Sequence, residues 1–181
     1  MATILEQLNQ DHGNVSRLLD AMELQLRTLQ SGAAFDPALL TRIMRYLTQY
    51  QDVYHHPRED LMFACVVLRA PVAANDIETI EAEHRTLATH GRDLHAAASA
   101  SKPDEPSATL PQLLESYIAG LRDHMRLESS TVFPLARVIL ADTDWDELDS
   151  QFEVARDPLF GPQVEQAYRG ILEVLGQQSR K

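Results

Sequence analysis

Apolar residues recur at alternating steps of three and four along most of this chain. This period is typical of helices that bury one face, and no segment shows the strict alternation of a half-buried strand. Turn-forming residues interrupt the pattern at Ser31-Gly32, at Pro71 and in the proline-rich stretch 101–107. The sequence therefore predicts an all-α protein with four long helices, near residues 2–31, 37–69, 76–99 and 108–141.

The remaining residues, 142–181, are expected to form a helical extension that packs on a bundle made by residues 1–141. A short helix is expected from Thr143, followed by a break at the sequence Asp-Pro-Leu-Phe-Gly-Pro and by a last helix near 163–177. The extension carries apolar residues that favour either covering the bundle or binding a protein partner or a second copy of the chain: Trp145, Phe152, Leu159 and Phe160.

Each of the four predicted helices carries a histidine among its inward-facing apolar positions. In the second and fourth helices a glutamate follows that histidine by four residues, which places both heads on one face about one turn apart. In two antiparallel helices joined by a short loop, residues that are equally far from the loop along the chain lie side by side. Counting residues in this way places all these groups in one layer. The predicted metal-binding set is His12, His55, Glu59, His84, His124 and Glu128.

The two halves of the chain repeat this arrangement. The dipeptide Asp11-His12 precedes the first His-x-x-x-Glu motif, and the dipeptide Glu83-His84 precedes the second at nearly the same spacing. A bundle built from two such helix pairs would present two His-His-Glu sets across a pseudo-twofold axis.

The residue types point to metal chemistry. Imidazole suits Fe, Zn, Cu and Ni, and a carboxylate can bridge two ions while neutralising their charge. A single inward-facing histidine is more often a hydrogen-bonded core residue than a ligand. Two buried carboxylates with no basic partner are too costly for a purely structural bundle, however, and a pair of cations best satisfies four imidazoles and two carboxylates.

Composition excludes several classes of partner. The chain has 181 residues and a formal charge of -11, with 16 Lys and Arg against 27 Asp and Glu, so no basic patch is expected to attract nucleic acid or an anionic membrane. No export signal or membrane-spanning segment is expected. The single cysteine, Cys65, rules out an internal disulfide, in agreement with a cytoplasmic location.

Four blocks of sequence carry a family resemblance: Asp11-His12, the stretch YHHPRED from Tyr54, Glu83-His84, and the stretch HMRLE from His124 with Phe133-Pro134. In this order they resemble the hemerythrin-like (HHE cation-binding) proteins over roughly residues 1–140. The resemblance implies an up-down-up-down four-helix bundle around a non-haem di-iron centre.

The resemblance also assigns roles to the six residues. His12 and His55 would hold one iron, His84 and His124 would hold the other, and the two glutamates would bridge them. An oxo or hydroxo bridge is expected between the irons, and Zn or another divalent ion could occupy the site in purified protein.

Two positions depart from the oxygen-carrying members of the family. Those proteins have a further histidine where this chain has Ala88 and an aspartate where it has Ser129. Each ion would then keep an open position, which disfavours reversible oxygen carriage. The leading expectation is a di-iron protein that binds or reacts with oxygen, peroxide or nitric oxide, and peroxidase-like, catalase-like or oxidase activity stays open. An iron or oxygen sensor that acts through a protein partner is the alternative, whereas ferritin-like carboxylate proteins use more carboxylates than this chain offers.

Other polar residues are expected outside this ligand set. His56 lies about 100° from His55 around a regular helix and is therefore expected in the outer shell or at the surface, the alternative being that it replaces His55 as a ligand. Glu81 and Asp60 are candidates to accept imidazole N–H bonds, although solvated charge is the expected role of both. The remaining residues are expected at the surface or in packing roles: His90, His95, Tyr117 and Cys65.

Overall fold

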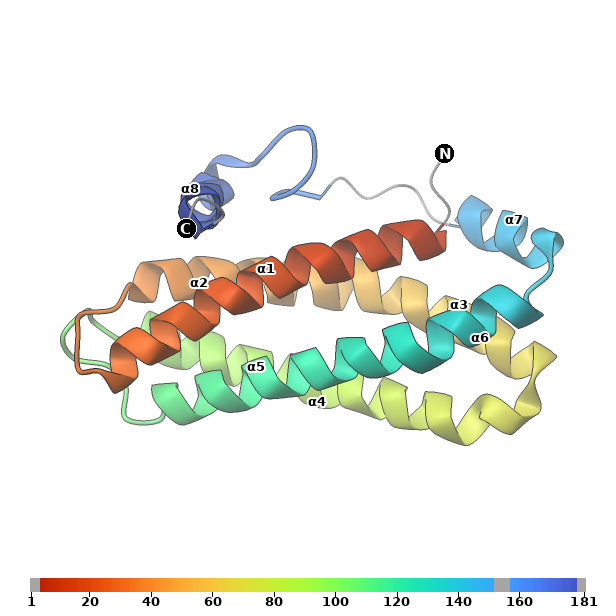
Figure 1. The fold of residues 1–181 in the computed structure, drawn as a ribbon, viewed down its shortest axis with the longest axis horizontal. Helices are drawn as coiled ribbons and strands as arrows, with labels where there is room; N and C mark the ends of the chain where they lie inside the picture. The colour runs from red at the N-terminus through yellow and green to blue at the C-terminus, as the bar shows by residue number, and fades with distance from the viewer. Residues whose placement is uncertain (1–3, 152–156, 179–181) are drawn as a thin grey trace.

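The protein is a four-helix bundle with an extra helical segment, as seen in a computed structural model that describes residues 4–151 and 157–178. Within these residues every regular element is helical, which confirms the all-α prediction. Successive rods of the bundle run in opposite directions along its length (Figure 1). The first rod is α1 (Ile4–Gln30), the second joins α2 (Pro37–Tyr46), η1 (Leu47–His55) and α3 (His56–Arg69), the third is α4 (Ala74–Ser99), and the fourth joins α5 (Leu110–Leu127), η3 (Glu128–Val132) and α6 (Phe133–Ile139).

Local signals set where the rods begin and end. After α1 the chain turns at Gly32, whose φ of 72° lies in the left-handed region that favours glycine. The Asp36 side chain then caps α2 by accepting a hydrogen bond from the Leu39 N–H at 2.9 Å, and Pro37 occupies the first turn, where its missing N–H has no cost. A short 3₁₀ turn, η2 (Pro71–Ala73), leads into α4.

The second and fourth rods each contain a π-helical stretch immediately before a proline. Pro57 is the second residue of α3 and Pro134 is the second residue of α6. A proline inside an α-helix removes one hydrogen bond, and its ring clashes with the carbonyl four residues earlier. In η1 and η3 the backbone makes the wider i→i−5 bonds instead, since the His56 N–H bonds to the Gln51 carbonyl. Each rod therefore continues past its proline as a helix.

A polar layer divides the interior into two apolar clusters. One cluster lies toward the α1–α2 turn and contains Val15, Leu47 and Leu121, while the other lies toward the α3–α4 turn and contains Leu8 and Met62, among other residues. Between them lie buried histidines and glutamates, in positions where the apolar period alone would place a leucine or a valine. This layer is where the six predicted side chains meet.

The C-terminal segment packs against the bundle at two places. The helix α7 (Asp142–Gln151) lies at the end where α1 begins, and Asp149 Oδ1 accepts a hydrogen bond from the Ile4 N–H at 2.9 Å. Farther along, η4 (Gln166–Tyr168) and α8 (Arg169–Gln178) lie over α1 and α2, where Leu159 and Ile171 are fully buried. Phe152, one of the apolar residues singled out above, lies outside the described residues.

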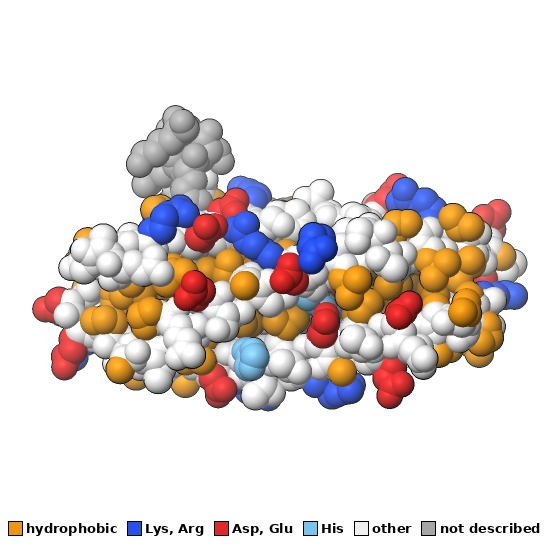
Figure 2. All heavy atoms as spheres, turned by 60° about the horizontal axis from the view of Figure 1, so that its bottom comes forward, with side chains coloured by type: hydrophobic (Ala, Val, Ile, Leu, Met, Phe, Trp, Pro, Cys, Tyr) orange, Lys and Arg blue, Asp and Glu red, His pale blue; other side chains and the backbone are white. Residues whose placement is uncertain are grey.

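The surface agrees with the acidic composition. On the face that α4 and α5 present, hydrophobic side chains run along the molecule between acidic and other polar side chains, and a histidine is visible near the middle (Figure 2). None of the helices in the described ranges combines the length and apolar character that a membrane span requires.

Candidate metal centre

Two glutamates occupy the centre of the polar layer, and both are completely buried. Glu59 Oε1 lies 3.0 Å from His55 Nε2 and 3.3 Å from His12 Nε2. The other oxygen of Glu59 lies 3.5 Å from His84 Nε2. One carboxylate from the first half of the chain thus faces imidazoles from both halves.

Glu128 repeats this arrangement from the opposite side. Its Oε1 lies 3.2 Å from His124 Nε2 and 3.3 Å from His84 Nε2. Its Oε2 lies 3.3 Å from His12 Nε2. The structure therefore brings all six predicted side chains together, one histidine from each rod and one glutamate from each half.

The Nδ1 atom of each of these four imidazoles, which points away from the glutamates, contacts a side-chain oxygen of another residue. With Nδ1 engaged in this way, Nε2 is the nitrogen that points toward the glutamates, and the ring is fixed in one orientation. The four contacts are His55 Nδ1 with Asp11 Oδ2 at 3.1 Å, His124 Nδ1 with Glu83 Oε2 at 2.9 Å, His84 Nδ1 with Asp60 Oδ1 at 3.0 Å, and His12 Nδ1 with Ser129 Oγ at 3.1 Å.

These outer acceptors follow the internal repeat. The acid that precedes the first histidine of each half, Asp11 or Glu83, contacts the second histidine of that half. The residue that follows each central glutamate, Asp60 or Ser129, contacts a histidine of the other half. Solvated charge was the expected role of Asp60 and Glu81, and the contact of Asp60 with His84 corrects this for Asp60. The corresponding contact of His124 is made by Glu83 and not by Glu81. The internal repeat already paired Asp11 with Glu83 in the sequence, but it did not indicate that they accept hydrogen bonds from histidines.

The electrostatics of the layer favour positive charge. Burial alone would raise the pKa of both glutamates, yet the surrounding imidazoles hold the pKa of Glu59 well below its ordinary value and lower that of Glu128 to about 2. Burial would likewise lower the pKa of His55 and His84, but the facing carboxylates raise these values to about 10 and about 11. Both glutamates are therefore ionised at neutral pH, and they require either protonated imidazoles or a cation.

The hydrogen-bonding state of the layer fits a metal ion. Within the described residues, five buried atoms that face one another have no hydrogen-bond partner: His12 Nε2, His124 Nε2, Glu59 Oε1, Glu59 Oε2 and Glu128 Oε2. They lie at ion-pair distances without the geometry of hydrogen bonds, and such atoms are costly to bury unless something else satisfies them. Imidazole nitrogen and carboxylate oxygen are together the donor set of Fe, Zn and Mn sites, so the residues present suit a metal.

The potential ligand atoms fall into two groups that share Glu59. One group consists of His12, His55 and Glu59, and its ligand atoms all lie within 4.8 Å of one another. The other consists of His56, Glu59, His84 and His124, within the same distance. The division resembles the two ions expected from the sequence, with two differences: the second group contains one additional histidine, and neither group contains Glu128.

That histidine, His56, corrects a sequence expectation. It was expected in the outer shell or at the surface; the surface position is wrong, because His56 is buried, with an exposed fraction of 8%, and it belongs to the second group of potential ligands. The expectation assumed a regular α-helix, whereas His56 directly follows the π-helical η1. Burial and the neighbouring His84 lower the pKa of His56 well below its ordinary value, so its ring is neutral.

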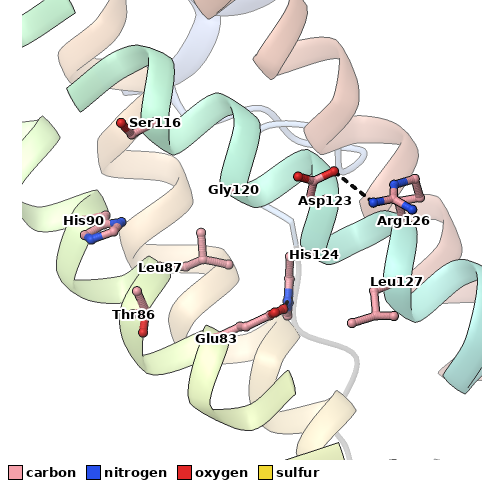
Figure 3. Close-up of a pocket in the computed structure, with 10 residues that line it drawn as sticks. All are labelled: Glu83, Thr86, Leu87, His90, Ser116, Gly120, Asp123, His124, Arg126 and Leu127. Atoms are coloured by element: carbon pink, nitrogen blue, oxygen red, sulfur yellow. Dashed lines mark hydrogen bonds and ion pairs between the residues drawn. The ribbon is translucent and has the colours of Figure 1, made fainter. Parts of the chain in front are cut away.

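A pocket reaches this layer from outside, between α4 and α5. It has a volume of about 460 Å³ and extends from the exposed His90 to Glu83 and His124. Figure 3 shows the Glu83 side chain pointing toward the His124 ring at the inner end of this pocket. His90 is thus at the surface, as expected, and it lies on the approach to the layer.

Two other sequence expectations concern packing. Tyr117 is buried in an apolar cluster, where burial raises the pKa of its hydroxyl above the ordinary value, in agreement with a packing role. Cys65 is partly buried and packs against the other cluster.

Comparison with protein families agrees with the geometry. The family described as the hemerythrin HHE cation-binding domain matches residues 3–136, which includes all four histidines and both glutamates of the layer. Searches of curated proteins and of solved structures gave no match. The matched region is most of the chain and coincides with the bundle that holds the buried His and Glu cluster, so the protein belongs to the hemerythrin HHE cation-binding domain family.

Proposed function

We propose that the protein holds two non-haem iron ions in the polar layer and reacts there with a small oxidant such as oxygen, peroxide or nitric oxide. His12 and His55 would bind one ion, His84 and His124 would bind the other, and Glu59 and Glu128 would bridge them. The observation that carries this proposal is that each fully buried carboxylate faces imidazoles from both halves of the chain, with atoms that lack hydrogen-bond partners.

The surrounding residues prepare the site for this role. The outer acceptors fix each imidazole with Nε2 directed inward, and the two apolar clusters exclude bulk water on both sides of the layer. The pocket between α4 and α5 gives a small molecule a route to the edge of the layer. When bound, a pair of irons would supply the electrons for reduction of a small oxidant.

The first test is metal content together with reactivity. We expect about two iron ions per chain after anaerobic reconstitution, rapid oxidation when the reduced protein is mixed with oxygen in a stopped-flow instrument, and consumption of peroxide by the oxidised protein. Protein reconstituted with zinc serves as the control, because it has the same fold without redox chemistry.

Two outcomes would contradict this proposal. If the protein binds no iron above background, the proposed function is wrong. If bound oxygen is released reversibly under vacuum, the protein carries oxygen and does not react with it.

A second candidate function, iron or oxygen sensing through a partner, is favoured by a link between the site and the C-terminal segment. The Tyr46 hydroxyl donates a hydrogen bond to Asp157 Oδ2 at 3.0 Å. Burial and also the charge of Asp11 raise the pKa of Asp157, and Asp11 accepts the hydrogen bond of His55. The contact that docks the C-terminal segment therefore lies within electrostatic range of Asp11, the acid that contacts His55.

Hydrogen exchange tests this second candidate. If metal state controls docking, amides of residues 157–175 will exchange faster in one metal state than in the other, while amides of α4 far from the layer keep their rates. Tyr46→Phe serves as the matched variant, because it removes the docking hydrogen bond without touching the site. Equal exchange of the segment in metal-free, reduced and oxidised protein would exclude sensing through this segment.

A further inference from the structure

His56 has the surroundings of a metal ligand. Its ring stacks on His84, with centroids 4.2 Å apart and planes at 14°, and its edge faces His124, with centroids 6.1 Å apart and planes at 89°. One of its ring nitrogens lies within 4.8 Å of the ligand atoms of Glu59, His84 and His124. The neighbouring His55 ring lies on its other side, with centroids 5.7 Å apart.

The outer nitrogen of His56 also faces a carboxylate. Asp52 Oδ1 lies 3.5 Å from His56 Nδ1, one helical turn earlier on the same rod. Each of the four predicted ligand histidines has an oxygen within hydrogen-bond distance of its Nδ1, closer than Asp52 is to His56, which leaves Nε2 for the centre. His56 therefore shares the outer contact as well as the burial of those four.

The backbone explains how two consecutive histidines both reach the interior. In a regular α-helix they would diverge by about 100°, and one of them would face away. In the wide turn of η1 the His56 N–H bonds to the carbonyl of Gln51, five residues earlier, and both His55 and His56 are buried. This π-helical turn thus adds one imidazole to the layer.

We propose that His56 is a third imidazole ligand of the ion held by His84 and His124, so that the two ions have unequal ligand sets. This inference rests on the proposed di-iron function and extends it. The ion held by His12 and His55 keeps only two imidazoles, and it is therefore the ion that retains the open position for a small oxidant.

The internal repeat supports the inequality. The position of the second half that corresponds to His56 is Met125, which directly follows His124 and is buried in an apolar cluster. A thioether is a softer ligand than imidazole and suits Cu(I) better than non-haem iron, and Met125 packs in the apolar cluster, so the second half offers no equivalent imidazole. The two halves therefore differ where one has His56 and the other has Met125. This difference would give one ion three imidazoles and the other ion two.

The repeat also supplies the test, because His56→Met copies the residue of the second half at nearly constant volume. We expect this variant to keep its helix content but to release one of its two irons to a competing chelator at least about tenfold more readily than the wild type. Mössbauer spectra of the reduced, ⁵⁷Fe-loaded wild type should show two distinct iron sites in equal amounts, and those of the variant should show two similar sites. His95→Met, on α4 away from the pocket and from the ligand groups, serves as the control and should match the wild type.

The outcomes separate this inference from the proposed function. If His56→Met matches the wild type in chelator competition and in spectrum while His55→Ala loses iron, His56 is no ligand and the di-iron proposal stands. A wild-type spectrum with two equivalent irons would also overturn the inference, whether or not the variant folds. A wild type that binds no iron would remove the proposed function and the inference together.

Discussion

Replacing Glu59 by glutamine is expected to lower the iron content from about two ions per chain to one or fewer. Glutamine keeps the volume of the side chain and one acceptor oxygen, but it removes the negative charge that two adjacent cations require. Glu59 is completely buried among imidazoles, so no water can take over its role. Elemental analysis and the absorption spectrum of the reconstituted protein will measure the loss.

The internal repeat provides a second variant and a control. Glu128→Gln should have the same effect, because Glu128 makes the equivalent contacts from the other half. Glu115→Gln, at an exposed position of α5, should leave both the iron content and the spectrum unchanged. A Glu59→Gln protein that holds two irons with an unaltered spectrum would exclude bridging by Glu59.

Removal of the metal is expected to lower the melting temperature by roughly 8–16 °C for each tightly held ion. A ligand present at a thousand times its dissociation constant stabilises the folded state by about 4 kcal/mol, and each 1 kcal/mol shifts the melting temperature of a chain of this size by about 2–4 °C. The effect should be large here, because without a cation the ionised Glu59 and Glu128 must share protons carried by the imidazoles.

Circular dichroism melts of metal-free and reconstituted protein will measure this difference. The Glu59→Gln variant should respond less to added metal than the wild type does. Identical melting curves with and without metal would show that the ions do not bind within the folded core.

Spacing along the chain was sufficient to predict most of the fold and the six central side chains. Apolar steps of three and four located the rods, and equal residue counts from short turns placed His12 level with His55. These arguments depend only on the regular rise of an α-helix, which the rods largely keep. The all-α bundle was therefore predictable before any coordinates.

The additional histidine was not predictable, because the backbone is not regular where it lies. His56 follows η1, and its direction depends on an i→i−5 hydrogen bond that apolar spacing does not reveal. The proline at position 57 was the available signal, since a proline within a long helical pattern requires some local change of the backbone. Which change occurs depends on how the rest of the bundle packs.

The place of the C-terminal segment was unpredictable for a different reason. Its apolar residues left open whether it covers the bundle or binds another protein, and in the structure Leu159 and Ile171 are buried. The surface that they cover is chosen by contacts distant in sequence, such as the bond between Tyr46 and Asp157. Local patterns carry no information about such pairs.

The pairing of the two halves has an evolutionary consequence. Asp60 of the first half supports His84 of the second, and Ser129 of the second half supports His12 of the first, so neither helix pair contains a complete site. Two identical half-length chains could assemble such a site as a symmetric dimer, but every substitution would then appear at both positions related by the axis. Fusion into one continuous chain removes that constraint. Positions 56 and 125 can therefore diverge, and a single gene can encode two chemically distinct sides of one centre.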